Sequence, residues 1–149
     1  MLELSCKWEM DKIQKIAVKQ ILELQDQVRD RVQPDLLRLA NWLGIVEVRN
    51  KAIKSLFYSL LPVESLIQLG NELQAGPLVL CGYKRLVEKT GGISEEHEEL
   101  LGQKTTSKLF RIREAYLQES KNRGHSFNTI KKIKKEFAEE LEAIEWVGN

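Results

Sequence analysis

Residues 76–92 read GPLVLCGYKRLVEKTGG, and this stretch decides the fold that the sequence predicts. Gly76-Pro77 ends one helix and opens the next, because proline has no N–H to donate and fits best in the first helical turn. The apolar run Leu78-Val79-Leu80-Cys81 then predicts a helix over residues 78–90, the most buried of the chain. Thr90-Gly91-Gly92 ends this helix and is the expected internal boundary.

The same pattern of helix breakers recurs along the rest of the chain. Proline or glycine stands at positions 34, 44, 62, 102 and 124. Between them apolar residues recur at spacings of three and four, which is the helical period. We therefore predict an all-α fold, a compact bundle of about eight helices joined by short loops. The expected helices cover residues 8–32, 35–43, 45–61, 62–74, 78–90, 94–102, 107–122 and 127–147.

Length and composition favour one helical domain. The chain has 149 residues, of which 42% are hydrophobic and 30% are charged, so a single domain over residues 1–149 is expected. A sub-boundary is expected at Gly91-Gly92, and residues 105–149 are expected to form a basic helical hairpin. Two cysteines outside any CxxC motif favour reduced thiols. The sequence shows neither a signal peptide nor a membrane-length apolar run, so we expect a cytoplasmic protein with no membrane partner.

The sequence offers little catalytic or metal chemistry. His97 has Leu101 where a zinc-binding HExxH motif would need its second histidine, so we interpret His97 as part of a solvated acidic turn. His125 is likewise interpreted as a turn residue. Cys81, in an apolar helix start, is interpreted as a buried small hydrophobe, and Cys6 has no local metal partner. Phosphate-binding glycine loops and nucleophile elbows are missing from the sequence, so we predict no catalytic residue, no metal site and no cofactor.

Charge is distributed unevenly along the chain. Residues 104–135 contain ten basic residues against only Glu114 and Glu119, which gives this segment a charge of +8. The remainder, with 13 basic and 20 acidic residues, carries −7, so the net charge of +1 hides a strongly dipolar molecule.

Helical phase predicts that most of this positive charge faces solvent on the two last expected helices. Arg113 is the exception, because it falls within the apolar stripe, where it should either extend to solvent or meet a buried acceptor. A continuous basic surface across the hairpin follows from the phase of the others. The predicted nucleic-acid-binding residues are Lys104, Lys108, Arg111, Lys121, Arg123, Lys131, Lys132 and Lys135.

The last expected helix has its charges in an unfavourable order. It begins with four lysines between residues 131 and 135 and continues with five glutamates between residues 136 and 145. A helix prefers acidic side chains at its N-terminus and basic ones at its C-terminus, by about 0.3–1 kcal/mol per charge. Local helix stability therefore does not account for the arrangement, and we interpret the lysines either as a solvated face or as a surface for an acidic partner.

Three functions are compatible with these features. The first is a non-enzymatic helical subunit of a larger complex that binds RNA or DNA backbone through the basic hairpin. The second is a protein interaction module that self-associates or docks an acidic partner protein. The third is a helical enzyme whose site the sequence does not reveal. We favour the first, because arginines are mixed with the lysines and polar residues such as Asn128 lie nearby.

Overall fold

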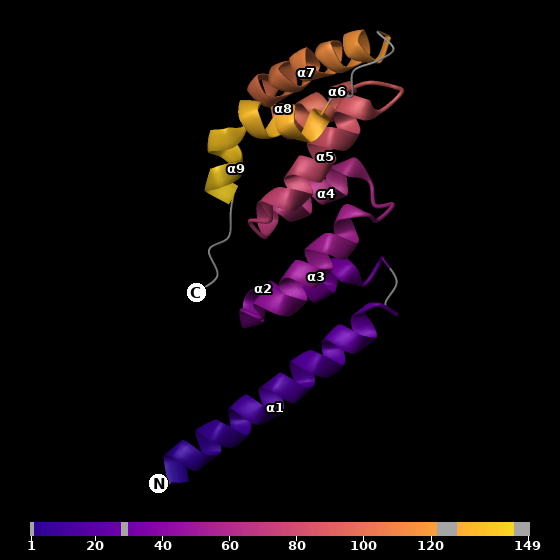
Figure 1. Cartoon of the computed structure of the whole chain (residues 1–149). Helices are drawn as coiled ribbons and strands as arrows, with labels where there is room; N and C mark the ends of the chain where they lie inside the picture. The colour runs from indigo at the N-terminus through magenta and orange to yellow at the C-terminus, as the bar shows by residue number, and fades with distance from the viewer. Residues whose placement is uncertain (1, 28–29, 122–127, 145–149) are drawn as a thin grey trace. The chain divides into compact units, whose positions relative to one another are not determined.

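The computed structural model describes residues 2–27, 30–121 and 128–144, and of residues 2–6 it describes the backbone alone. All regular structure within these ranges is helical, which confirms the all-α prediction (Figure 1). The helices of the described chain are α1 (Leu2–Gln25), α2 (Gln33–Leu43), α3 (Val46–Phe57), α4 (Val63–Glu72), α5 (Gly76–Glu88), α6 (Glu95–Leu101), α7 (Gln103–Lys121), α8 (Thr129–Glu136) and α9 (Ala138–Ile144).

The chain divides into two compact units, and the division falls between Ser59 and Leu60. The first unit contains α1, α2 and α3, and the second contains α4 to α9. The expected sub-boundary at Gly91-Gly92 lies inside the second unit, in the connection between α5 and α6. A single domain over residues 1–149 stays a prediction.

Proline and glycine begin and end helices largely where the sequence predicted. Pro34 and Pro77 lie in the first turns of α2 and α5, and Gly44 closes α2 with a left-handed φ of 68°. The first helix differs, because it was expected to run to Val32 and ends at Gln25.

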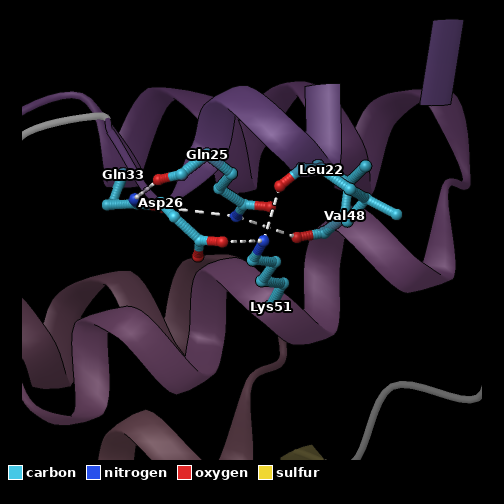
Figure 2. Close-up of polar contacts among 6 residues, drawn as sticks. All are labelled: Leu22, Gln25, Asp26, Gln33, Val48 and Lys51. Atoms are coloured by element: carbon cyan, nitrogen blue, oxygen red, sulfur yellow. Dashed lines mark hydrogen bonds and ion pairs between the residues drawn. The ribbon is translucent and has the colours of Figure 1, made fainter. Parts of the chain in front are cut away.

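Helix α1 ends at Gln25, and polar side chains there contact α2 and α3 (Figure 2). Gln25 is buried and donates from Nε2 to Gln33 Oε1 at 3.3 Å and to Val48 O at 3.4 Å. Gln33 Nε2 donates back to the backbone oxygen of Gln25 at 3.3 Å. Lys51 of α3 forms an ion pair with Asp26 at 3.0 Å. These contacts close the turn between α1 and α2 and make this junction a polar one.

Several apolar side chains of α1 are largely exposed. Ile13, Ile16 and Leu24 are 62%, 59% and 57% exposed. Helix α1 turns a different side toward α3, where Val18 and Leu22 are half-buried. A fully buried Ile or Leu contributes about 1.5–3 kcal/mol relative to an exposed one, and α1 leaves most of that unrealised within its own unit.

The core of the second unit surrounds α5, as the sequence predicted, and α4, α7, α8 and α9 all pack against this helix. Close approach of α4 and α5 depends on two glycines. A Cβ at Gly82 would lie 2.4 Å from Ile67 Cγ1, and one at Gly70 would lie 2.9 Å from the backbone nitrogen of Val79. The buried residues of α5 are Gly76, Leu78, Val79, Leu80, Cys81, Gly82, Tyr83, Leu86 and Val87.

Candidate nucleic-acid interface

The last expected helix is two helices, because the chain turns at Phe137. This side chain is 1% exposed and packs against Tyr83 of α5, with ring centroids 4.8 Å apart. Its backbone, at φ −113° and ψ 23°, separates α8 from α9, and both short helices contact α5. A single straight helix over residues 127–147 is therefore wrong.

The turn at Phe137 divides the charges that the sequence placed on one helix. Lys134 and Lys135 lie in the last turn of α8, and Glu139 and Glu140 lie in the first turn of α9, which are the helix ends that the dipole favours for these charges. Lys131 and Lys132 remain in the first turn of α8, and Glu136 remains at its end. One long helix with reversed charges is not present, so the case for the basic surface depends on exposure.

Four lysines occupy the solvent-facing side of α8. Thr129 and Ile133 are buried on the opposite side, and Asn128 caps the helix by accepting a hydrogen bond from the backbone N–H of Lys131 at 3.0 Å. Thr129 Oγ1 donates to Glu88 Oε1 at 2.8 Å, which attaches the start of α8 to α5. The exposed side chains are Lys131, Lys132, Lys134 and Lys135. Lys134 was not among the predicted binding residues, although its charge belongs to the +8 segment. Ile130 and Ile133 face the core, which leaves all four lysines outside.

Helix α7 contributes further cations beside α8, against which it packs. Lys104, Arg111 and Lys121 are exposed, as expected, and Glu114 is the exposed acidic residue among them. Arg123, which was also assigned to the site, and His125 lie outside the described residues. We call the exposed side chains Lys104, Arg111, Lys121, Lys131, Lys132, Lys134 and Lys135 the basic surface.

Lys108 was expected to face solvent with its neighbours, and this prediction is wrong. Its side chain is 17% exposed, and Nζ lies 2.6 Å from Glu140 Oε1 and 3.0 Å from the backbone oxygen of Glu136. The ammonium also lies 4.9 Å from the centroid of the Phe137 ring. This hydrogen bond from Lys108, above all, lowers the pKa of the Glu140 carboxyl below its usual value. Lys108 thus joins α7 to α9 and is committed to a carboxylate within the molecule.

Arg113 was expected either to extend to solvent or to meet a buried acceptor, and its guanidinium instead binds part-buried and exposed backbone carbonyls. Its Nη1 donates to the backbone oxygens of Val87 at 2.6 Å and Lys89 at 2.7 Å. These carbonyls belong to the last turn of α5 and the residue that follows it, where a helix leaves acceptors without intrahelical partners and carries partial negative charge. The guanidinium therefore caps α5 from α7.

His97 is buried, at 3% exposure, which contradicts its interpretation as part of a solvated turn. Its Nδ1 accepts a hydrogen bond from the backbone N–H of Ser94 at 3.0 Å, and its Nε2 lies 2.7 Å from Glu64 Oε1. With Nδ1 as the acceptor, Nε2 carries the hydrogen and donates a hydrogen bond to the Glu64 carboxylate. Ser94 is the N-cap of α6, and His97 completes its capping box while joining α6 to α4.

The pKa of the Glu64 carboxyl is lowered in the folded protein. The largest cause is a hydrogen bond from its own backbone N–H at the start of α4, and hydrogen bonding to His97 adds to it. The Ser94 hydroxyl also lies 2.7 Å from His97 Nδ1 and accepts a hydrogen bond from the α6 backbone as part of the capping box. Since the arrangement joins two helix N-termini through one carboxylate, we interpret it as structural.

The other reactive side chains of α5 are buried. Burial raises the pKa of the Cys81 thiol, which confirms its interpretation as a small buried hydrophobe. Burial, with a contribution from the charge of Glu140, raises the pKa of Tyr83 to about 12. Among the described side chains, no group of three or more histidines, cysteines, aspartates or glutamates is placed to hold a metal ion.

A groove of about 530 Å³ lies between α1 and the start of α3 within the first unit. Charged residues of both signs line it beside an apolar floor, and this lining contains no histidine, cysteine or serine to supply a nucleophile and its base. The lining residues are Asp11, Gln14, Lys15, Val18, Lys19, Leu22, Ile45, Val46 and Glu47.

Comparisons of the chain with protein-family models, with curated proteins and with solved structures found no match. None of the helices in the described part of the chain is long and apolar enough to cross a membrane.

The contacts of Lys108 predict a role in stability. We expect Lys108→Ala to lower the free energy of unfolding by about 1–2 kcal/mol, because it removes a hydrogen-bonded ion pair that solvent only partly screens. Lys104→Ala, one helical turn earlier and exposed, is the control and should change it by less than about 0.5 kcal/mol. Equal effects of the two substitutions in urea denaturation would contradict the assignment.

The lowered pKa of Glu64 predicts a pH-dependent contribution to stability. A carboxyl whose pKa falls on folding stabilises the native state at pH values above its unfolded pKa, and this contribution disappears as the pH falls through the folded pKa. Glu64→Gln should therefore be less stable than the native chain at pH 7, with the difference shrinking steadily in acid. Urea denaturation between pH 7 and pH 3 measures this, with the exposed Glu99→Gln as control. A difference independent of pH would refute the linkage.

Proposed function

We propose that this chain binds the phosphate backbone of nucleic acid through the basic surface, without reading base sequence, as a subunit of a larger complex. The observation that carries the proposal is the exposure of all four lysines of α8, a helix of eight residues whose single acidic residue, Glu136, ends it. Exposed lysines close together on a short rigid element suit a polyanion, because each can neutralise one phosphate and release its condensed counterions.

Lysine chemistry favours backbone contact over base readout. Direct readout of bases relies mainly on Arg, Asn and Gln, which form paired hydrogen bonds with base edges, whereas an ammonium group acts as a point charge. The basic surface contains one arginine, Arg111, and the four lysines of α8 outnumber it. Helix α8 is short, and Ile133 and Thr129 attach it to α5. It therefore presents its charges as a patch and has little length to follow a groove of the nucleic acid.

The proposed interface differs from the expected one in two of the cations. Lys108 is committed to Glu140, so it is left out of the proposed interface, and Lys134 is added. The partner is RNA or DNA, because both carry the phosphodiester groups that lysines contact. A nucleic-acid partner is also compatible with the cytoplasmic location expected from the cysteine content.

Binding should weaken steeply with salt, and the slope should report the lysines of α8. Each phosphate contact contributes about −0.9 to the slope of log affinity against log salt for duplex DNA and about −0.7 for single strands. Replacing Lys131, Lys132 and Lys135 together by alanine should therefore reduce the magnitude of this slope by about 2–3. Fluorescence anisotropy with a labelled oligonucleotide between 25 and 200 mM salt, on the order of physiological ionic strength and below, measures it.

A control of equal charge change separates local contact from net charge. The triple alanine variant of Arg31, Lys54 and Lys89 removes three exposed cations outside the basic surface and should leave the slope nearly unchanged. An unchanged slope in the α8 variant, or an equal loss in both variants, would overturn the proposal.

A further inference from the structure

Helix α8 spreads its four lysines around most of its exposed surface. Ile133 is buried and marks the side of the helix that faces the core. At about 100° per residue, Lys132 and Lys134 lie about 100° to either side of Ile133, so they are about 160° apart around the axis. Lys131 and Lys135 lie between them on the side opposite the core, about 40° apart. The flanking pair, Lys132 and Lys134, therefore leaves the helix in nearly opposite directions.

The span of the flanking pair suits two phosphates that belong to different strands. An α-helix with its side chains is about 10–12 Å wide, so the ammonium groups of Lys132 and Lys134 reach up to about this distance from each other. The minor groove of B-form DNA is about 6 Å wide and has the phosphates of one strand on each side. The two lysines therefore have the span to contact both strands, with Lys131 and Lys135 facing the groove between them.

Among the described side chains, no exposed aromatic ring lies beside the lysines of α8. Proteins that bind single strands commonly stack the bases on such rings. Phe110 of α7 is 43% exposed, but it lies about 160° around that helix from Lys108, whose hydrogen bond to the backbone oxygen of Glu136 marks the side facing α8. The other described rings of the second unit belong to its core or pack against it, and these are Tyr83, Tyr116 and Phe137. A single strand would thus be held by cations alone.

We propose that the basic surface binds double-stranded DNA in preference to single strands, with Lys132 and Lys134 on phosphates of opposite strands. This inference rests on the proposed contact between the basic surface and phosphate. Duplex DNA carries one charge per about 1.7 Å of its axis, so each lysine releases more condensed counterions from it than from a single strand. The grooves of A-form RNA are one wide and one narrow, so duplex RNA fits the span of the flanking pair less well.

Fluorescence anisotropy with one sequence in three forms tests this preference. The labelled oligonucleotide, of about 20 bases or roughly two duplex turns, is used as single-stranded DNA, as duplex DNA and as duplex RNA at about 50 mM salt. Four contacts at about −0.9 each in the duplex and about −0.7 each in the single strand predict about tenfold tighter binding to duplex DNA. Duplex RNA should bind less tightly than duplex DNA.

The outcomes separate this inference from the proposed function. Equal or tighter binding of the single strand or of duplex RNA overturns the preference for duplex DNA and leaves contact with phosphate standing. If none of the three forms binds, both are overturned.

Two double variants of equal charge change test the contact with both strands. Replacing Lys132 and Lys134 by alanine should lower the affinity for duplex DNA about threefold or more beyond the effect of replacing Lys131 and Lys135. The two variants should weaken single-strand binding equally, because a flexible strand can reach any of these exposed lysines. Since all four side chains are exposed, circular dichroism should show equal helix content. Equal losses of affinity for duplex DNA would contradict the bridging role of the flanking pair.

Discussion

The packing of Phe137 against Tyr83 is the contact on which the arrangement of the second unit depends. Phe137 is buried at the point where the chain leaves α8, and it turns the chain so that α9 also reaches α5. The turn brings Glu140 within reach of Lys108 on α7, and their ion pair joins the two elements. Without the turn, a straight helix would carry lysines at its start and glutamates at its end, against its own dipole. One buried aromatic ring thus decides both the packing and which cations remain exposed.

Polar side chains hold the helices of the second unit at their ends. Arg113 of α7 caps the last carbonyls of α5, and His97 joins the start of α6 to Glu64 in the first turn of α4. Each contact satisfies backbone or carboxylate groups that a helix terminus leaves available. The apolar core around α5 supplies burial, while these contacts fix where α6 and α7 begin and end. A rigid support of this kind presents the lysines of α8 on a defined surface.

The features that local physics decides could be predicted from the sequence. The all-α fold and the central burial of α5 both followed from periodicity and helix-breaking residues. Predictions failed where tertiary packing overrides local preference. The period of residues 127–147 continues through Phe137, so the break is invisible without the α5 surface that buries this ring. The fate of Lys108 depended on Glu140, 32 positions away, and that of His97 on Glu64, 33 positions away.

The first helix shows a different limit of sequence information. The spacing of its apolar residues is typical of an amphipathic helix. Periodicity alone does not say whether the apolar side meets its own domain or another chain. In the structure Gln25 and Lys51 make the junction with α2 and α3, while Ile13 and Leu24 stay exposed. The basic side chains of α8 and the exposed apolar side chains of α1 lie in different units.

Contact between the lysines of α8 and phosphate can be observed residue by residue with NMR. In a titration of isotopically labelled chain with a short oligonucleotide at low salt, we expect the resonances of Lys131, Lys132, Lys134 and Lys135 to shift together. The side chain of Lys108 should keep its contact with Glu140 throughout. Shifts confined to other helices, or none at all in α8 while the oligonucleotide binds, would contradict it.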